Sequence, residues 1–344
     1  MAKTKKQKAL YITAIVLGAV FALYLLFACL PKPQNYAFPN PMLKTGEMPH
    51  LVAHGGGNKE FPDNTLEAFY NAYDADSNAM METDVSITKD GVVILSHDIS
   101  LDRKTNATGA IADWNYTDLI AQKVDFSYLN SSVENEAFTG TDADRKKFKN
   151  DEGVFVAPTD VPGYPQGLPG RDKEVFLATT LEELLVAFPQ NRISIEIKQS
   201  GETGYRALNA VMQLLEKHNA YGRVVLASFH AEIYKKLQAM QKQNPSLLYS
   251  PETGGVVKYF VLKTLGLDFF FRNGVGMLQI PTSQMGINLA TKSLVKNAHK
   301  HNIAVHYWTV DDVEEMKHLI KIGADGITTN YPHRLKQVYE TYAK

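Results

Sequence analysis

Apolar and polar positions alternate in a regular way along the chain from about residue 50 onward. Apolar runs of about four to eight residues, typical of buried strands, are followed by stretches with the three- or four-residue spacing of an amphipathic helix. The predicted strands are 51–53, 79–88, 92–96, 192–198, 223–228, 246–249, 277–280, 286–289, 303–310 and 326–329. The predicted helices are 64–76, 180–188, 205–217, 231–243, 255–270, 291–301, 312–322 and 333–342.

This alternation predicts a parallel sheet with helices outside it, in the α/β class. About eight strand–helix units favour a closed (β/α)8 TIM barrel over an open doubly wound sheet, and no glycine-rich dinucleotide motif follows any strand. Strands 79–88 and 92–96 are the exception, because the turn at 89–91 predicts an antiparallel hairpin. Residues 119–175 are rich in Asn, Asp, Gly and Pro, which predicts an insertion into the barrel.

One long stretch near the N-terminus carries no charge. As a helix, residues 9–30 match a hydrocarbon core about 30 Å thick. Lysines crowd the preceding tail, residues 1–8, and the positive-inside bias keeps such a tail in the cytoplasm. We therefore predict one transmembrane helix that acts as a signal anchor in the cell membrane, with the remainder of the chain outside the cytoplasm.

Two other interpretations of this stretch stay open. A cleaved signal peptide would usually have a shorter apolar region, of about 7–15 residues. The run Leu26-Phe27-Ala28-Cys29 resembles a bacterial lipoprotein cleavage box, which would place a lipid on the only cysteine. All three interpretations export the remainder of the chain.

Residues 31–48 follow the apolar stretch. Prolines recur there, around Pro31 and Pro39, so the segment is predicted to be a stiff linker without helix. The barrel domain is predicted over residues 49–344. Composition removes other classes of function: a formal net charge of −1 gives no basic surplus for nucleic acid, and one cysteine rules out a disulfide framework or a Cys-rich zinc module.

Chemically active side chains gather at the ends of the predicted strands. In a barrel, catalytic groups lie at the C-terminal ends of the strands. His54 ends the first strand, and His97 ends the hairpin partner of the second. Ser228 ends a later strand and Trp308 the seventh, although Trp308 taken alone is typical of a core residue. Two histidines in one region provide groups for proton transfer.

Two strands carry pairs of charged residues at the spacing of one sheet face. Residues i and i+2 of a strand point to the same side, so Glu82 shares a face with Asp84, and Glu196 shares a face with Lys198. Three carboxylates in a low-dielectric cavity repel one another, and a hard cation such as Ca²⁺ or Mg²⁺ relieves that repulsion. Each residue alone is equally typical of an ion pair or a solvated face. Their conjunction with the two histidines indicates phosphodiester cleavage.

Longer motifs run through the same positions, at 54–69, 82–98, 101–109, 195–198, 228–229, 308–310 and 323–332. Together they resemble the glycerophosphodiester phosphodiesterase family, in its membrane-anchored bacterial form, over about residues 50–335. The resemblance implies a barrel with one divalent cation, and a reaction that releases an alcohol from a glycerophosphodiester and leaves sn-glycerol 3-phosphate. The roles it implies are metal binding for Glu82, Asp84 and Glu196, acid–base catalysis for His54 and His97, and substrate binding for Lys198, Trp308 and Ser228.

The chain departs from the family at Gly55, where the family usually has an arginine that helps bind phosphate. The expected substrate is a glycerophosphodiester, a lysophospholipid or the polyglycerol-phosphate of a cell wall. Two alternatives are a phospholipase D or cyclising lyase acting on membrane lipid, and a non-catalytic barrel that binds wall or lipid. Export to a calcium-rich exterior favours Ca²⁺ over Mg²⁺. The very apolar run 256–271 predicts either a core-facing helix or a segment that docks on the bilayer.

Overall fold

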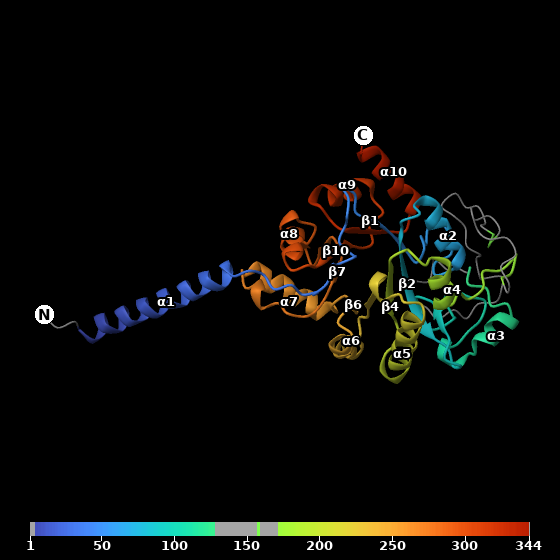
Figure 1. Cartoon of the computed structure of the whole chain (residues 1–344), viewed down its shortest axis with the longest axis horizontal. Helices are drawn as coiled ribbons and strands as arrows, with labels where there is room; N and C mark the ends of the chain where they lie inside the picture. The colour runs from blue at the N-terminus through green and yellow to red at the C-terminus, as the bar shows by residue number, and fades with distance from the viewer. Residues whose placement is uncertain (1–3, 128–156, 159–170, 344) are drawn as a thin grey trace.

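Eight parallel strands form a barrel in the computed structural model, which describes residues 4–127, 157–158 and 171–343 (Figure 1). Their order around the barrel is β6-β5-β4-β2-β1-β11-β10-β7. A hydrogen bond of 3.2 Å from the Gly276 N–H to the Tyr249 carbonyl joins the two outer strands. The strands are β1 (His50–His54), β2 (Met80–Ile87), β4 (Ile193–Ile197), β5 (Val224–Ala227), β6 (Leu248–Tyr249), β7 (Met277–Ile280), β10 (Ala304–Tyr307) and β11 (Gly326–Thr329). The predicted TIM barrel is therefore confirmed.

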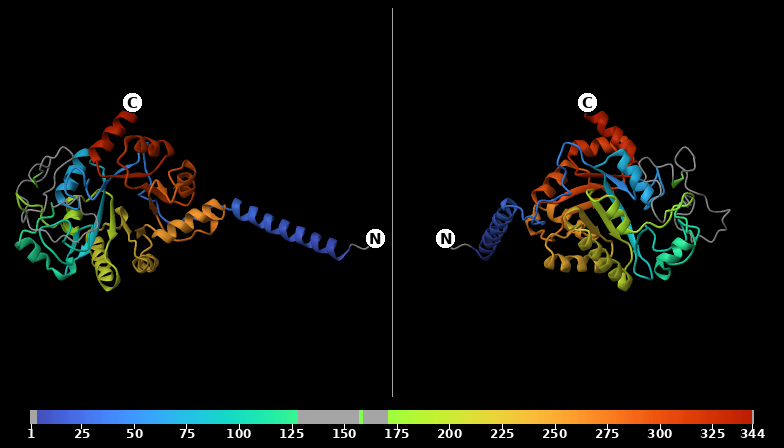
Figure 2. Two further views of the ribbon diagram at one scale, coloured as in Figure 1. Left: turned by 180° about the vertical axis from the view of Figure 1, so that it is seen from behind. Right: turned by 45° about the vertical axis from the view of Figure 1, so that its right-hand side comes forward.

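Helices surround the barrel, as the two views of Figure 2 show. Their apolar sides face the strands: α5, for example, buries Ala207, Leu208 and Val211. The main helices are α2 (Leu66–Ala75), α4 (Leu181–Ala187), α5 (Gly201–Lys217), α6 (Ala231–Gln243), α7 (Thr253–Thr264), α8 (Lys292–Lys300), α9 (Val313–Ile322) and α10 (Pro332–Tyr342). Shorter helical elements are η1 (Ile111–Asp113), α3 (Tyr116–Ala121), η3 (Tyr221–Arg223) and η4 (Asp268–Phe270).

The hairpin next to β2 is present as predicted. Strand β3 (Val93–Leu95) pairs antiparallel with β2, in the register Val85 with Leu95 and Ile87 with Val93. The ladder continues with a hydrogen bond of 2.9 Å from the Ser96 N–H to the Asp84 carbonyl. This pairing brings His97, the residue after Ser96, alongside the middle of β2, next to Asp84.

One predicted strand lies outside the barrel. Within 286–289, only Ile287–Asn288 (β9) is extended, and it pairs with Ser283–Gln284 (β8) in an exposed two-stranded ribbon. The apolar residues there are too few and too exposed to form a buried barrel face. The predicted insertion, 119–175, falls largely outside the described residues. Its described beginning packs Leu119, Val124 and Phe126 into a small apolar cluster beside β3.

The predicted linker packs against the barrel. Tyr36 and Met42 are buried with Val52 and Met277 in a cluster of their own. The Asn40 side chain donates hydrogen bonds to the carbonyls of residues 276 and 302, at 2.6 and 2.9 Å. Burying each of these large apolar side chains contributes about 1.5–3 kcal/mol. Part of the predicted linker, from about residue 35, therefore packs on the barrel, and the domain boundary at residue 49 stays a prediction.

Helix α1 (Lys5–Cys29) projects away from the barrel, and none of its residues is buried (Figure 1). It is long and apolar enough to cross a membrane, and a signal sequence near an N-terminus has the same character. Its C-terminal end contacts the barrel domain. There the Phe27 ring lies 5.0 Å from the ring of Phe270 and 6.2 Å from that of Phe269, measured between centroids.

Candidate functional site

A cavity of about 270 Å³ opens at the C-terminal ends of the barrel strands. The sequence prediction named eight site residues, and all of them line this cavity: His54, Glu82, Asp84, His97, Glu196, Lys198, Ser228 and Trp308. Further lining residues are Ala227, Phe229, Ser250, Pro251, Gln279, Thr309 and Thr328. The i, i+2 spacing predicted that Glu82 and Asp84 share one strand face, and all of these side chains do face the cavity. The parallel register of β2 and β4 sets Asp84 directly beside Glu196.

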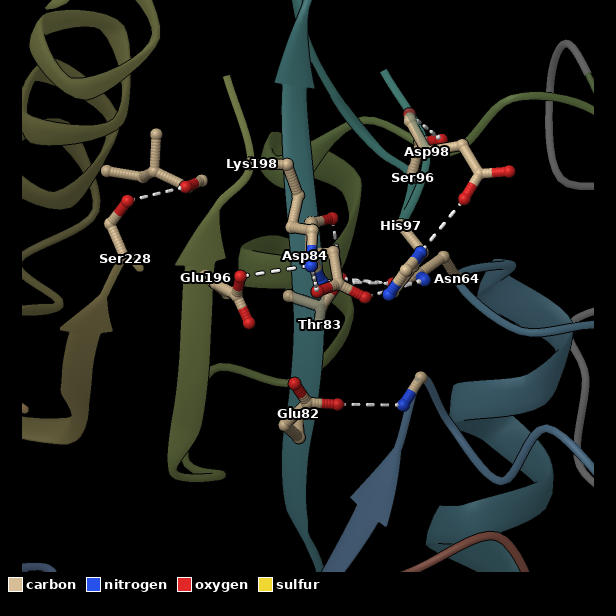
Figure 3. Close-up of polar contacts among 12 residues, drawn as sticks. Asn64, Glu82, Thr83, Asp84, Ser96, His97, Asp98, Glu196, Lys198 and Ser228 are labelled. Atoms are coloured by element: carbon tan, nitrogen blue, oxygen red, sulfur yellow. Dashed lines mark hydrogen bonds and ion pairs between the residues drawn. The ribbon is translucent and has the colours of Figure 1, made fainter. Parts of the chain in front are cut away.

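The charged centre of the cavity holds two carboxylates joined by an ammonium group (Figure 3). The Lys198 Nζ lies 3.0 Å from Oε1 of Glu196 and 3.5 Å from Oδ1 of Asp84. Burial lowers the pKa of Lys198, but the carboxylates of Asp84 and Glu196 raise it further, so the net shift is upward. The lysine therefore carries its charge inside the cavity.

Glu82 lies deeper on the same strand, where its Oε2 accepts a hydrogen bond of 3.0 Å from the Gly55 N–H. Burial, and after it the charge of Asp84, raise the pKa of Glu82 to about 7. The same two causes raise the pKa of Glu196. The charge of Asp84 thus opposes the ionisation of both Glu82 and Glu196.

This donor set can be tested against a divalent cation. Within the described part of the chain, no three His, Cys, Asp or Glu side chains already surround one point, because Lys198 bridges Asp84 and Glu196. The chemistry of the set nevertheless fits: the donors are carboxylate oxygens, which Ca²⁺ and Mg²⁺ prefer, and their repulsion is what a cation relieves.

The tautomer of His54 follows from its partner. The His54 Nδ1 lies 2.7 Å from Oδ1 of Asn330. The amide nitrogen of Asn330 donates to the Asp311 carboxylate at 2.6 Å, so the Asn330 oxygen faces the imidazole. That oxygen only accepts, so Nδ1 carries a proton and Nε2 is the nitrogen left for the cavity. Burial lowers the pKa of His54, but Glu82 and the Asn330 hydrogen bond raise it more.

His97 is oriented by an acid beside it in the chain. Its Nδ1 lies 2.9 Å from Oδ1 of Asp98, which leaves Nε2 for the cavity. Arg103 holds Asp98 with two hydrogen bonds, of 2.8 and 2.6 Å. Burial opposes ionisation of Asp98, but the hydrogen bonds from His97 and Arg103 bring its pKa well below the usual range. Asp98 and Asn330 are positioning residues whose tasks the sequence prediction missed, although both lie within its motifs.

Asn64 is a third positioning residue that the prediction left without a task. Its Oδ1 accepts from the Asp84 N–H at 3.2 Å and from the Thr83 hydroxyl at 2.7 Å, and its Nδ2 donates to Oδ2 of Asp84 at 3.3 Å. The backbone of Asn64 has φ 58, a left-handed conformation that asparagine tolerates better than most residues. Asn64 thereby sets the orientation of the Asp84 carboxylate.

Gly55, where the sequence departs from the family pattern, lies next to a partly buried ion pair. A Cβ at Gly55 would lie only 2.8 Å from the Cβ of Asp63. Asp63 pairs with Lys104, and both line a small recess that also contains His97. Burial raises the pKa of Asp63, but Lys104 lowers it more. A second cation therefore stands beside the catalytic cavity without an arginine at position 55.

The space around Gly55 leads to a stability prediction. Gly55 has φ +55 and Gly91 has φ +88, but nothing lies within 4 Å of a Cβ built at Gly91. We expect Gly91→Ala to lower the free energy of unfolding by about 1 kcal/mol, for the backbone conformation alone. Gly55→Ala adds the contact with Asp63, so a loss of at least about 2 kcal/mol is expected. Denaturant unfolding in the presence of a chelator measures both, and equal losses would contradict the clash.

Ser228 and Trp308, both predicted to bind substrate, differ in how much of the side chain remains available for contact with a substrate. The Ser228 hydroxyl donates to the Ile197 carbonyl at 2.9 Å and accepts from the His230 N–H at 3.2 Å. Its proton is therefore engaged with the backbone, and its substrate contact stays a prediction. Trp308 is 38% exposed, and its neighbour in the cavity wall, Phe229, is 59% exposed. The mouth of the cavity is therefore partly apolar.

Comparison with known proteins gives one consistent result. The model of the Glycerophosphoryl diester phosphodiesterase family matches residues 54–334. A glycerophosphodiester phosphodiesterase of Caldanaerobacter subterraneus is 26% identical over 286 residues, which cover 83% of this chain and 95% of the relative. A lysophospholipase D of Homo sapiens is 22% identical over an alignment of 348 positions, which covers 92% of this chain and 97% of the relative. The structure of an Oleispira antarctica phosphodiesterase in complex with the product sn-glycerol-3-phosphate superposes with a TM-score of 0.58 at 17% identity, and covers 85% of this chain and 97% of that one.

Proposed function

Since the chain belongs to the glycerophosphoryl diester phosphodiesterase family and is a phosphoric diester hydrolase, we propose that it cleaves glycerophosphodiesters by metal-dependent acid–base catalysis at the outer face of a membrane. The products are sn-glycerol 3-phosphate and an alcohol. One observation carries the proposal: two imidazoles, each with its Nδ1 proton held by a partner, share one cavity with three opposed carboxylates and a lysine.

In this proposal Glu82, Asp84 and Glu196 hold one divalent cation, Ca²⁺ or Mg²⁺, with Ca²⁺ favoured by the exported location. When bound, the cation neutralises charge on the phosphodiester. Lys198 keeps its proton, because the pKa is raised despite burial, and contacts a phosphate oxygen. Lys104, which lines a small recess together with His97, places a second ammonium group near the site, although that group is paired with Asp63.

The two histidines divide the proton transfers. The free hydroxyl of the substrate's glycerol attacks phosphorus and forms the new P–O bond of a cyclic phosphate, and the bond from phosphorus to the leaving alcohol breaks. One imidazole Nε2 takes the proton from the attacking hydroxyl, and the other Nε2 gives a proton to the leaving oxygen. Water then opens the ring with the two roles reversed, which leaves sn-glycerol 3-phosphate.

The decisive assay follows glycerol 3-phosphate released from glycerophosphocholine, with and without a chelator. We expect release that stops with chelator and returns when Ca²⁺ or Mg²⁺ is added back. The folded protein could instead turn over none of these substrates in the presence of metal: glycerophosphodiesters, lysophospholipids or teichoic-acid fragments. Only the non-catalytic binding function would then remain. Appearance of a stable cyclic product would instead support the lyase alternative.

The location is supported by α1, which fits a membrane span. We propose that it stays attached as a signal anchor, with the barrel outside the cytoplasm. Mass spectrometry of the purified N-terminus tests this directly. An intact Met1 or Ala2 supports the anchor, whereas a mature chain that begins at a lipid-bearing Cys29, or beyond the apolar run, replaces it with one of the cleaved forms.

A lysophospholipid substrate is the second candidate, favoured by the apolar mouth of the cavity. Phe229 and Trp308 offer exposed aromatic surface for the acyl chain, which stays on the glycerol phosphate when the head-group alcohol leaves. We expect Phe229→Ser to reduce kcat/KM for a lysophospholipid by roughly tenfold, since burying a large apolar side chain is worth about 1.5–3 kcal/mol. Turnover of glycerophosphocholine should change little. Phe38→Ser, at an exposed phenylalanine that does not line the cavity, is the matched control. Equal losses on both substrates would argue against this role of Phe229.

A further inference from the structure

An apolar surface lies where helix α7 meets the short helix η4. Val261 of α7 and Leu265, the residue that caps its C-terminus, lie one turn apart and are 46% and 53% exposed, and Phe270 of η4 is 47% exposed. The opposite side of α7 packs into the barrel through the buried Tyr259. Together with Phe269, these residues form what we term the α7–η4 surface. Large apolar side chains that are exposed on consecutive turns do not contribute to the packing of the barrel core, and such patches are typical of interaction surfaces.

The α7–η4 surface is joined to the end of α1. The Phe27 ring lies at a tilt beside the rings of Phe269 and Phe270, and the Lys32 ammonium pairs with Asp268 at 2.8 Å. Asp268 also accepts from Asn297 at 2.7 Å. In Figure 1, α7 accordingly lies between α1 and the remainder of the barrel. The last turns of α1 and this surface therefore share one apolar contact.

This contact fixes the position of the α7–η4 surface along the axis of α1, and therefore its depth in a bilayer that α1 crosses. A Cβ at Gly266 would lie 2.9 Å from the Tyr24 hydroxyl, so the turn after α7 is at the level of Tyr24. Helix α1 continues beyond Tyr24 to Cys29. At 1.5 Å per residue, that is about 7 Å of further helix. An α1 that spans the bilayer to its end therefore carries Leu265 and its neighbours to the depth of an interfacial segment, about 5–10 Å below the headgroups.

The charges around this surface suit anionic headgroups. Lys258 and Arg272 are exposed on either side of it. The acidic groups nearby are already engaged: Asp268 by Lys32, and Glu252 by the backbone N–H groups at the start of α7. Apolar side chains with basic neighbours are typical of segments that lie in the membrane interface.

We propose that the α7–η4 surface docks into the outer-leaflet interface of the bilayer that α1 crosses. The proposal rests on α1 remaining as a membrane anchor, and it goes beyond catalysis, because it gives the barrel two points of attachment and therefore one orientation. Helix α7 begins just after Pro251, which lines the cavity, so this second attachment also sets the position of the cavity mouth relative to the lipid.

Tryptophan fluorescence in nanodiscs tests the proposal without reference to catalysis. The native chain has two tryptophans, whose signal is measured on the parent protein and subtracted. Leu265→Trp adds a probe to the surface. Val186→Trp is the matched control: Val186 is 60% exposed and belongs to α4, a helix on the other side of the barrel from α7 in Figure 1. Both variants are checked by their thermal unfolding midpoint, and the full chain by intact mass.

With brominated phospholipid, we expect most of the fluorescence added at position 265 to be quenched and that added at position 186 to be unaffected. Quenching at 265 should also be stronger in anionic phosphatidylglycerol discs than in phosphatidylcholine discs at low salt. Equal, weak quenching at both positions would overturn the proposal, as would a purified chain that lacks α1. Either result is independent of whether the enzyme hydrolyses any glycerophosphodiester.

Discussion

Replacing His97 with alanine is expected to slow release of glycerol 3-phosphate by about 10²–10⁴-fold, the range in which a general acid or base contributes. His54→Ala should have an effect of the same order, since the two imidazoles act on opposite ends of one displacement. Losses of residues that work as a unit do not add, so the double variant should be little slower than either single one. Initial rates on glycerophosphocholine with saturating Ca²⁺ measure all three.

The control for this experiment is another histidine paired with a carboxylate. His218 lies 2.8 Å from Glu182, on outer helices away from the cavity, and His218→Ala should keep full activity. Asp98→Asn tests the positioning role: it keeps the size of the side chain but removes the charge that holds the His97 Nδ1 proton. We expect a lower kcat with little change in KM. Full activity in His54→Ala or His97→Ala would remove that residue from the proposed acid–base pair.

Sequence periodicity was sufficient for the part of the site that depends on strand alternation. Glu82, Asp84 and Glu196 could be assigned to one face because side chains alternate along a strand, and the β2–β4 register then brought them together. What periodicity could not show were contacts between distant segments. His54 and Asn330 are 276 residues apart, and nothing local in the chain indicates that one fixes the tautomer of the other.

The sequence prediction and the structure also differ at the linker and at Ser228, and both differences come from contacts between segments that are distant in the chain. The proline-rich segment before the barrel lacks regular structure, so composition indicates a linker. Its burial depends on Met42 and Tyr36 meeting Val52 and Met277 across the end of the barrel. The engagement of the Ser228 hydroxyl is likewise a matter of which carbonyl the fold places nearby. Polar residue types at strand ends predict a site, but not which of their hydrogen atoms remain free.

Divalent cations are expected to stabilise the protein much more at pH 8 than at pH 5. In the folded protein without metal, the pKa of Glu82 is raised to about 7 from an ordinary value of 4.5. The folded state therefore holds this proton more tightly than the unfolded state, and the stability of the metal-free protein falls as pH rises from about 4.5 to 7. The raised pKa of His54 acts in the same direction, because its favourable charge is lost as pH rises through that pKa.

A bound cation removes this cost, because it needs the carboxylates ionised and offsets their repulsion. The shift at Glu82 corresponds to about 3 kcal/mol. We therefore expect the rise in Tm on adding Ca²⁺ to chelator-treated protein to be larger at pH 8 by at least about 5 °C. Glu82→Gln cannot ionise, so its metal-free Tm should vary less with pH and its response to Ca²⁺ should be small at both values. An equal rise at pH 5 and pH 8 in the parent protein would mean that the cation binds elsewhere than among Glu82, Asp84 and Glu196.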